Sequence, residues 1–203
     1  MGLIAIVPGR DKKADKELKE VEKTDCQKKL AKYCKETQYW DVYRAAVTKI
    51  TDQDLLAELV INSRDGDSAI KALQNIQDQN KLIEIARNVR HGYLRMEIAA
   101  KLIDKDIAQK LYSEIAEDGA ESFAIRVEAL EKTQDQDLCQ LVYTDIAKKI
   151  ENHSFNGTDE VDAAIKAIEH LTDQDILADV LKNSRPNTSI HFAAKYRISE
   201  LNK

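Results

Sequence analysis

A short motif centred on aspartate recurs along the chain and constrains the fold more than any other feature of the sequence. Residues 50–57 read ITDQDLLA and residues 171–178 read LTDQDILA, so these two stretches are near copies. Weaker versions lie between them, with steps of 26, 26, 31 and 38 residues from one version to the next. A period of about 20 to 50 residues is typical of stacked-repeat proteins. The first aspartates of the successive versions are Asp52, Asp78, Asp104, Asp135 and Asp173.

Apolar residues stand at fixed distances before each motif aspartate and predict a helix there. The positions 10, 6, 5 and 2 residues before it are mostly apolar, which is the spacing of one helical face. A small residue is common six residues before the aspartate, where it lets a neighbouring helix approach closely. We therefore expect this position to be buried between repeats. The residues there are Ala46, Ala72, Ile98, Ala129 and Ala167.

A further amphipathic run follows each motif aspartate, and a polar turn with Gly, Asn or Pro ends that run. Each repeat is thus a first helix, a turn and a second helix, with the aspartate at the start of the first helix. Thr51 with Asp54, and Thr172 with Asp175, fit a capping box. We interpret the motif as a helix cap and not as a metal site, since a metal site would not need to occur five times.

The two ends of the chain predict closing helices. Residues 1–15 read as a flexible or apolar lead, and residues 16–37 as one N-terminal cap helix. A C-terminal cap helix is expected over 187–203, capped by Thr188 or Ser189 and with Phe192 facing inward. The single tryptophan, Trp40, is expected to anchor the N-terminal cap on the first repeat.

The predicted fold is all-α: a right-handed α-solenoid of about five short helical hairpins over 38–186, with a helical cap at each end. The whole of 16–203 is expected to form a single repeat domain.

Two segments, 42–52 and 125–135, resemble the V-R-x-x-A-[AL]-x-x-[IL] helix of the HEAT-repeat family in its bacterial short-repeat form. Arg95 and Arg126 match the arginine of that pattern, whereas Tyr43 departs from it. The resemblance covers residues 38–201, although steps of 26 are shorter than the family's usual period of about 40. It implies an armadillo-like helical solenoid and says little about chemistry, because the family is defined by its scaffold.

Composition limits the classes of partner. The net charge is −5 with both signs interleaved, so there is no basic stripe of the kind that binds nucleic acid. No run approaches the roughly 18 apolar residues of a membrane span. Cys26, Cys34 and Cys139 are odd in number and lack metal-ligand spacing, which favours free thiols and a cytoplasmic location.

No catalytic motif is found, and we expect no enzymatic activity, cofactor or metal site. The four histidines stand in different repeats, and none has a partner three or four residues away as in a helical metal site. They are His91, His153, His170 and His191.

The solvent side of the second helices is the candidate partner-binding face, because second helices usually line the concave side of a helical solenoid. Its mixed charges are typical of a surface for a protein or peptide partner, and the predicted function is a non-catalytic protein–protein interaction scaffold. The resemblance leaves two alternatives open, a HEAT-like DNA-base-repair glycosylase and a bilin-lyase-like protein. The candidate binding residues are Lys71, Asn75, Glu97, Lys101, Glu128, Lys132, Lys166 and His170.

Overall fold

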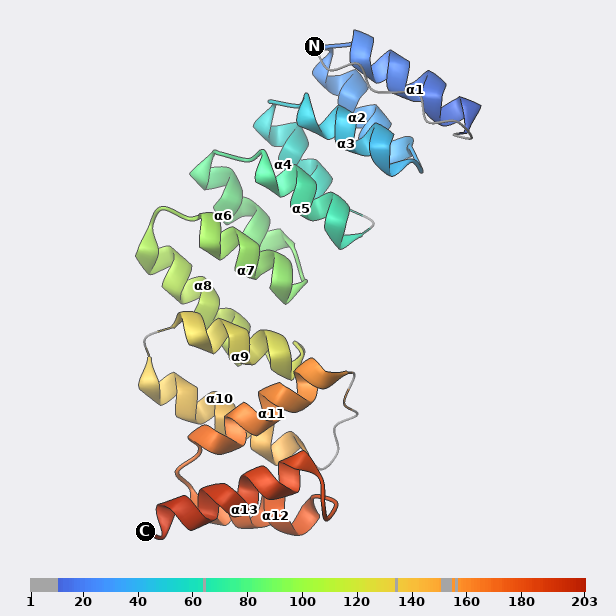
Figure 1. Ribbon diagram of the computed structural model, residues 1–203. Helices are drawn as coiled ribbons and strands as arrows, with labels where there is room; N and C mark the ends of the chain where they lie inside the picture. Colours follow the sequence, from blue (N-terminus) through green and yellow to red (C-terminus); the bar gives the residue numbers. More distant parts are fainter. Residues whose placement is uncertain (1–10, 64, 134, 151–154, 156) are drawn as a thin grey trace. The chain divides into compact units, whose positions relative to one another are not determined.

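The computed structural model describes residues 11–63, 65–133, 135–150, 155 and 157–203 (Figure 1). Most of the predicted N-terminal lead, together with His153, lies outside the described residues. The described part of the chain forms α-helices and contains no strand, which confirms the all-α prediction. The helices are α1 (Lys12–Lys23), α2 (Gln27–Glu36), α3 (Trp40–Thr48), α4 (Gln53–Ile61), α5 (Gly66–Gln74), α6 (Gln79–Asn88), α7 (Gly92–Lys101), α8 (Lys105–Glu117), α9 (Phe123–Lys132), α10 (Gln136–Lys149), α11 (Thr158–His170), α12 (Gln174–Asn183) and α13 (Ser189–Leu201).

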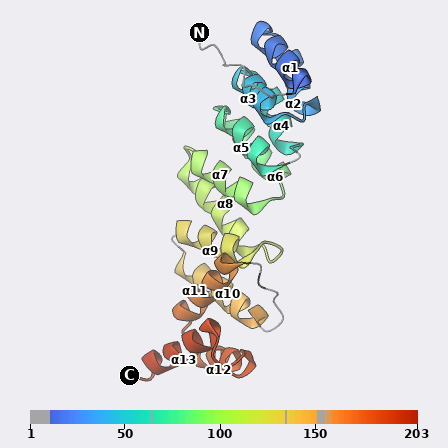
Figure 2. The same cartoon turned by 45° about the vertical axis from the view of Figure 1, so that its right-hand side comes forward.

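The helices gather into two compact units, which are described separately. Unit 1 contains α1 to α6 with residues 101–103, and unit 2 contains α7 up to Ala100 with α8 to α13. Within each unit consecutive helices pair as hairpins, such as α4 with α5 and α12 with α13. The second helices pack side by side, α1, α3 and α5 in unit 1 and α9, α11 and α13 in unit 2 (Figure 2). The first helices form the other layer of each unit.

The motif aspartates are the N-caps of the first helices, as predicted. Asp52 Oδ1 accepts hydrogen bonds from the N–H groups of Asp54 and Leu55, at 3.0 and 3.1 Å. Asp173 caps α12 with the same geometry. The capping boxes predicted at Thr51 and Thr172 are wrong by one residue, because the aspartate that follows each threonine occupies the cap position. The remaining motif aspartates, Asp78, Asp104 and Asp135, cap α6, α8 and α10.

The position six residues before each motif aspartate is fully buried, which confirms the predicted helix face. Each of these five side chains is 0% exposed. The apolar residues five positions before the aspartate are buried too, among them Leu73 and Ile168. Small side chains at this position allow the backbones of neighbouring second helices to come close, so the repeat register rests on residue size as well as on apolar character.

The single N-terminal helix predicted over 16–37 is wrong. Two helices occupy this range, because Thr24 leaves the helical conformation with φ −105° and ψ 138°. Its hydroxyl accepts a hydrogen bond from the N–H of Cys26 at 3.4 Å, the local bond by which threonine competes with a helix. The helix α1 also begins earlier than predicted, with Asp11 as its N-cap. At the other end α13 is capped by Thr188, as expected, and pairs with α12 as the second helix of a hairpin.

Glutamine side chains of the first helices clamp the loop of the next hairpin, a role that the sequence did not predict. Gln27 Oε1 accepts from the N–H groups of Thr51 and Asp52, at 2.7 and 3.2 Å, while its Nε2 donates to the carbonyl of Lys49 at 3.2 Å. One repeat later Gln53 repeats the arrangement. Its Oε1 accepts from Gln77 and Asp78 N–H, and its Nε2 donates to the carbonyl of Asn75.

Unit 2 keeps a weaker form of the clamp. Gln109 Nε2 donates to the Lys132 carbonyl at 2.8 Å, and Gln140 Nε2 donates to the His170 carbonyl at 2.9 Å. Both glutamines stand five residues after a motif aspartate, whereas Gln53 directly follows one. The clamp therefore changes position along the first helix while serving the same loop.

The caps give a first test of the repeat register. Replacing Asp173 by Ala should lower the free energy of unfolding by about 1 kcal/mol, since two N–H groups of α12 lose their acceptor. Thr172→Ala should have a smaller effect, because the Thr172 hydroxyl makes only a 3.4 Å contact with Gln140. Urea unfolding of both variants measures the difference. Equal losses would show that Asp173 is not the effective cap.

The glutamine clamp gives a second test. Gln53→Ala should lower the free energy of unfolding by about 1 to 2 kcal/mol, because it removes the partners of two loop N–H groups and one carbonyl. Gln77→Ala is the matched control, since that side chain is exposed in the same loop. Chemical denaturation compares the two variants, and a Gln53 variant as stable as its control would contradict the clamp.

Candidate partner-binding surfaces

The predicted binding residues of unit 1 serve largely to hold the fold. The residue three positions before a motif aspartate donates its side-chain hydrogen bonds to backbone carbonyls at the end of the preceding second helix. Lys49 Nζ donates to the carbonyls of Val21, Glu22 and Thr24, at 2.6 to 3.2 Å. The last carbonyls of a helix have few donors of their own, and the Val21 carbonyl accepts one further bond, from the N–H of Thr24 at 3.3 Å, so a side-chain donor there completes the helix end.

Asn75 and Lys101 occupy the same position in the next repeats. Asn75 Nδ2 donates to the Val47 carbonyl at 2.8 Å, and Lys101 Nζ donates to the Gln74 carbonyl at 3.2 Å. Lys71, one turn earlier on α5, instead contacts the Gln74 side chain at 3.1 Å. Two of the three predicted binding residues of this unit are therefore tied to backbone groups.

In unit 2 the remaining predicted residues lie on α7, α9 and α11. Glu97 and Glu128 are exposed. Burial raises the pKa of the Tyr112 phenol, and the nearby negative charges of these two glutamates raise that pKa further. Lys166 forms an ion pair with Glu131, which joins the outer sides of α11 and α9.

The last two residues of this face, Lys132 and His170, end the helices α9 and α11. The His170 ring stacks on Tyr143 with 5.3 Å between centroids and 14° between planes. The backbone carbonyls of both residues accept the glutamine clamps described above. Their side chains are exposed, so both remain available on this face.

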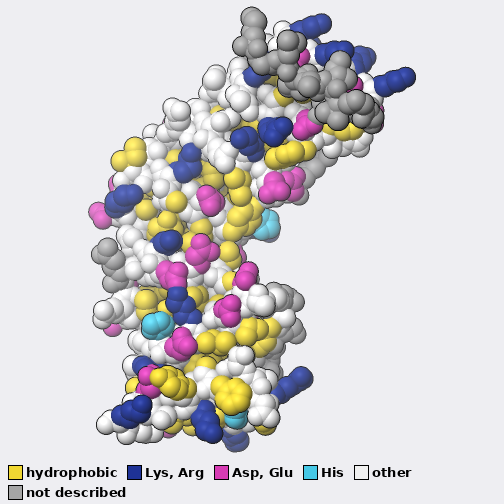
Figure 3. Space-filling model, in the orientation of Figure 1, with side chains coloured by type: hydrophobic (Ala, Val, Ile, Leu, Met, Phe, Trp, Pro, Cys, Tyr) yellow, Lys and Arg dark blue, Asp and Glu magenta, His cyan; other side chains and the backbone are white. Residues whose placement is uncertain are grey.

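Carboxylates gather on the outer side of α9 and α11 (Figure 3). Besides Asp159 in the first turn of α11, the exposed acids are two glutamates on α9 and an aspartate and a glutamate on α11, against two lysines, of which Lys166 is already paired with Glu131. We call this surface the acidic face. Its members are Glu128, Glu131, Asp162 and Glu169.

Two aromatic side chains extend the acidic face onto α13, which packs beside α11. Phe192 is 56% exposed and Tyr196 is 62% exposed, and they stand one helical turn apart. Ala164 and Ala194 are fully buried, one in each of these helices. When the two helices are aligned on these alanines, Phe192 stands at the position of Asp162 and Tyr196 at that of Lys166.

The prediction that Phe192 faces inward is therefore wrong. The buried side of α13 is formed by Ile190 and Ala194, which stand four residues apart. Phe192 lies midway between them in sequence and so points to another side of the helix.

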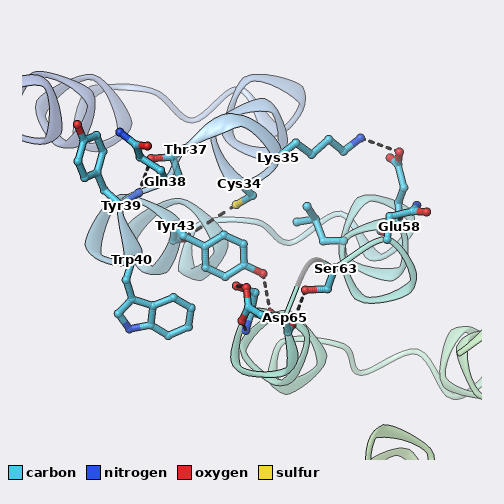
Figure 4. Close-up of a pocket in the computed structure, with 13 residues that line it drawn as sticks. Cys34, Lys35, Thr37, Gln38, Tyr39, Trp40, Tyr43, Glu58, Ser63 and Asp65 are labelled. Atoms are coloured by element: carbon cyan, nitrogen blue, oxygen red, sulfur yellow. Dashed lines mark hydrogen bonds and ion pairs between the residues drawn. The ribbon is translucent and has the colours of Figure 1, made fainter. Parts of the chain in front are cut away.

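Unit 1 carries a cavity beside Trp40 (Figure 4). Trp40, which was expected to anchor the N-terminal cap on the first repeat, is 44% exposed. One face of its indole stacks on Tyr43, with 5.5 Å between centroids and 12° between planes. A cavity of about 500 Å³ opens next to this pair, between the turn joining α2 to α3 and the turn joining α4 to α5.

Tyr43 and Cys34 line the cavity and are held by hydrogen bonds, and the Cys34 thiol is not a nucleophile. The Tyr43 hydroxyl donates to the Ser68 carbonyl at 2.6 Å, and the Cys34 thiol contacts the Tyr43 carbonyl at 3.9 Å. Burial raises the pKa of Cys34 to about 12. The thiol therefore stays protonated near neutral pH, whereas attack on a substrate requires the thiolate.

Two general features of the described residues bear on function. No group of three or more His, Cys, Asp or Glu side chains among them is arranged to hold a metal ion. None of the helices described here is long and apolar enough to cross a bilayer.

Comparison of the chain with protein-family models, with curated proteins and with solved structures found no match.

Proposed function

We propose that this chain is a non-catalytic interaction scaffold, a HEAT-like solenoid that binds a polypeptide partner on the outer side of α9, α11 and α13. The observation that carries the proposal is the acidic face continued by Phe192 and Tyr196. The partner segment would be basic and would carry an apolar side chain at one end.

The chemistry of this surface supports such a partner. Exposed carboxylates attract lysine and arginine side chains and speed the encounter with them. Large aromatic residues supply much of the binding energy at protein interfaces, since each buries a wide apolar area on contact. Phe192 and Tyr196 are available for this because more than half of each side chain is exposed.

Two features of the molecule argue against the two alternatives. Carboxylates on the second helices would repel the phosphates of DNA, which a glycosylase must bind. A bilin would favour a deep apolar pocket, whereas the cavity beside Trp40 is lined partly by Lys35, Glu58 and Asp65.

A charge-neutral variant tests the proposal. The probe is a fluorescent peptide with several lysines and one terminal leucine, and the measurement is fluorescence anisotropy at two salt concentrations. Glu128→Gln with Glu169→Gln should weaken binding about three- to tenfold, since each exposed ion pair contributes modestly. The matched control is Glu117→Gln with Asp179→Asn, which removes two exposed charges from α8 and α12 of the same unit.

A second pair of substitutions, Phe192→Ala with Tyr196→Ala, should weaken binding of the same peptide while the melting temperature changes little. A short DNA duplex should bind more weakly than the peptide at physiological salt. Tighter binding of the duplex, or equal effects of the acidic-face and control variants, would overturn the proposal.

A further inference from the structure

The indole of Trp40 stands between two cavities of unit 1. The larger, of about 500 Å³, and a smaller one of about 290 Å³ share Gln38, Tyr39 and Trp40 in their walls. With 44% of Trp40 exposed and Tyr43 stacked against its ring, the indole is held in place yet open to a ligand. Figure 4 shows its ring projecting from the start of α3 beside the Tyr43 ring.

Carboxylates line the cavities on both sides of this ring. Glu58 and Asp65 line the larger cavity, and Asp11 and Asp41 line the smaller one. Among the described residues of both walls, Lys35 is the one cation, and it is paired with Glu58 at 2.6 Å. Asp41 is paired as well, with Arg44 at 3.4 Å, so Asp11 and Asp65 are the acids that make the surroundings of the indole negative.

Two of these acids are fixed in position. The Tyr39 hydroxyl donates to Asp11 Oδ2 at 2.7 Å, and this bond lowers the pKa of Asp11, so the carboxylate stays charged. Asp65 is the N-cap of α5 and accepts from the N–H and the hydroxyl of Ser68, at 2.8 and 2.9 Å. An acid held in this way needs no rearrangement to meet a positively charged ligand.

We propose that the site formed by Trp40, Tyr43, Glu58 and Asp65 binds a guanidinium or alkylammonium group. The cation lies over the open indole face, because the negative face of an aromatic ring attracts cations and tryptophan does so best. The carboxylates supply charge-assisted hydrogen bonds to its N–H groups. The group belongs either to an arginine or lysine side chain of a polypeptide or to a free small amine. The site lies in unit 1 and does not depend on the acidic face of unit 2.

Fluorescence of the full chain tests this site directly, because Trp40 is the only tryptophan. The probe is N-acetylarginine amide, titrated at constant ionic strength. Its neutral isostere N-acetylcitrulline amide has nearly the same shape. The arginine compound should change the emission with saturation and bind about tenfold tighter than the citrulline compound. Equal affinities of the two compounds would overturn the proposal.

Matched variants distinguish binding at this site from a general effect of surface charge. Asp65→Asn should weaken binding of the arginine compound several-fold. The cap of α5 should be kept, since asparagine caps helices as well as aspartate does. Glu22→Gln, an exposed charge change on α1, should leave the affinity unchanged. Trp40→Ala, followed by calorimetry, should abolish binding, and its melting temperature checks that the variant is folded. A folded Trp40→Ala or Asp65→Asn variant with wild-type affinity would contradict the assignment.

The source of the cation follows from a comparison of agmatine with a short peptide containing one arginine. Tighter binding of agmatine identifies a free amine as the ligand, and tighter binding of the peptide identifies a side chain. Both outcomes require that the site also binds the arginine compound more tightly than the citrulline compound.

Discussion

The fold depends on satisfying the backbone of the loop that precedes each first helix. Such a loop exposes the last carbonyls of one helix and the first N–H groups of the next, and each of these costs free energy if it is left without a partner. The motif aspartate caps the N–H groups that follow it, as Asp52 does in α4. Gln27, from the preceding repeat, binds the two N–H groups before the helix and the carbonyl of Lys49. One loop thus joins a local cap to a contact between repeats.

Sequence periodicity predicted the helices and their buried faces because both follow from short-range geometry. The alanines six residues before the motif aspartates are all buried, as the spacing required. The glutamine clamp escaped prediction because its partners lie 24 or 25 residues away in the chain. The recurrence of glutamine at 27, 53 and 79 was a usable signal. The break at Thr24 was missed since helix-forming residues on both sides mask a single local hydrogen bond.

The binding residues were harder to predict than the fold, because exposure on a helical wheel does not show where a long side chain ends. Lys101 and Asn75 stand at solvent-side positions, yet each turns back to a carbonyl of a neighbouring helix. The opposite error affected Phe192, which was expected to face inward, and Trp40 is more open than a packing anchor suggests. Both carry much of their surface outside. Only the packing of neighbouring helices decides such positions.

The clamp also bears on how a chain of this kind could gain or lose length. Gln53 and Gln79 both follow a motif aspartate, and they are separated by one period of 26 residues. Excision of 53–78 would place Gln79 directly after Asp52 and restore the same dipeptide at the junction. Every remaining loop would keep its clamp, because each glutamine acts on the repeat that follows it. Duplication of the same segment would likewise repeat the dipeptide at its borders, so the number of repeats could change without a new kind of loop clamp.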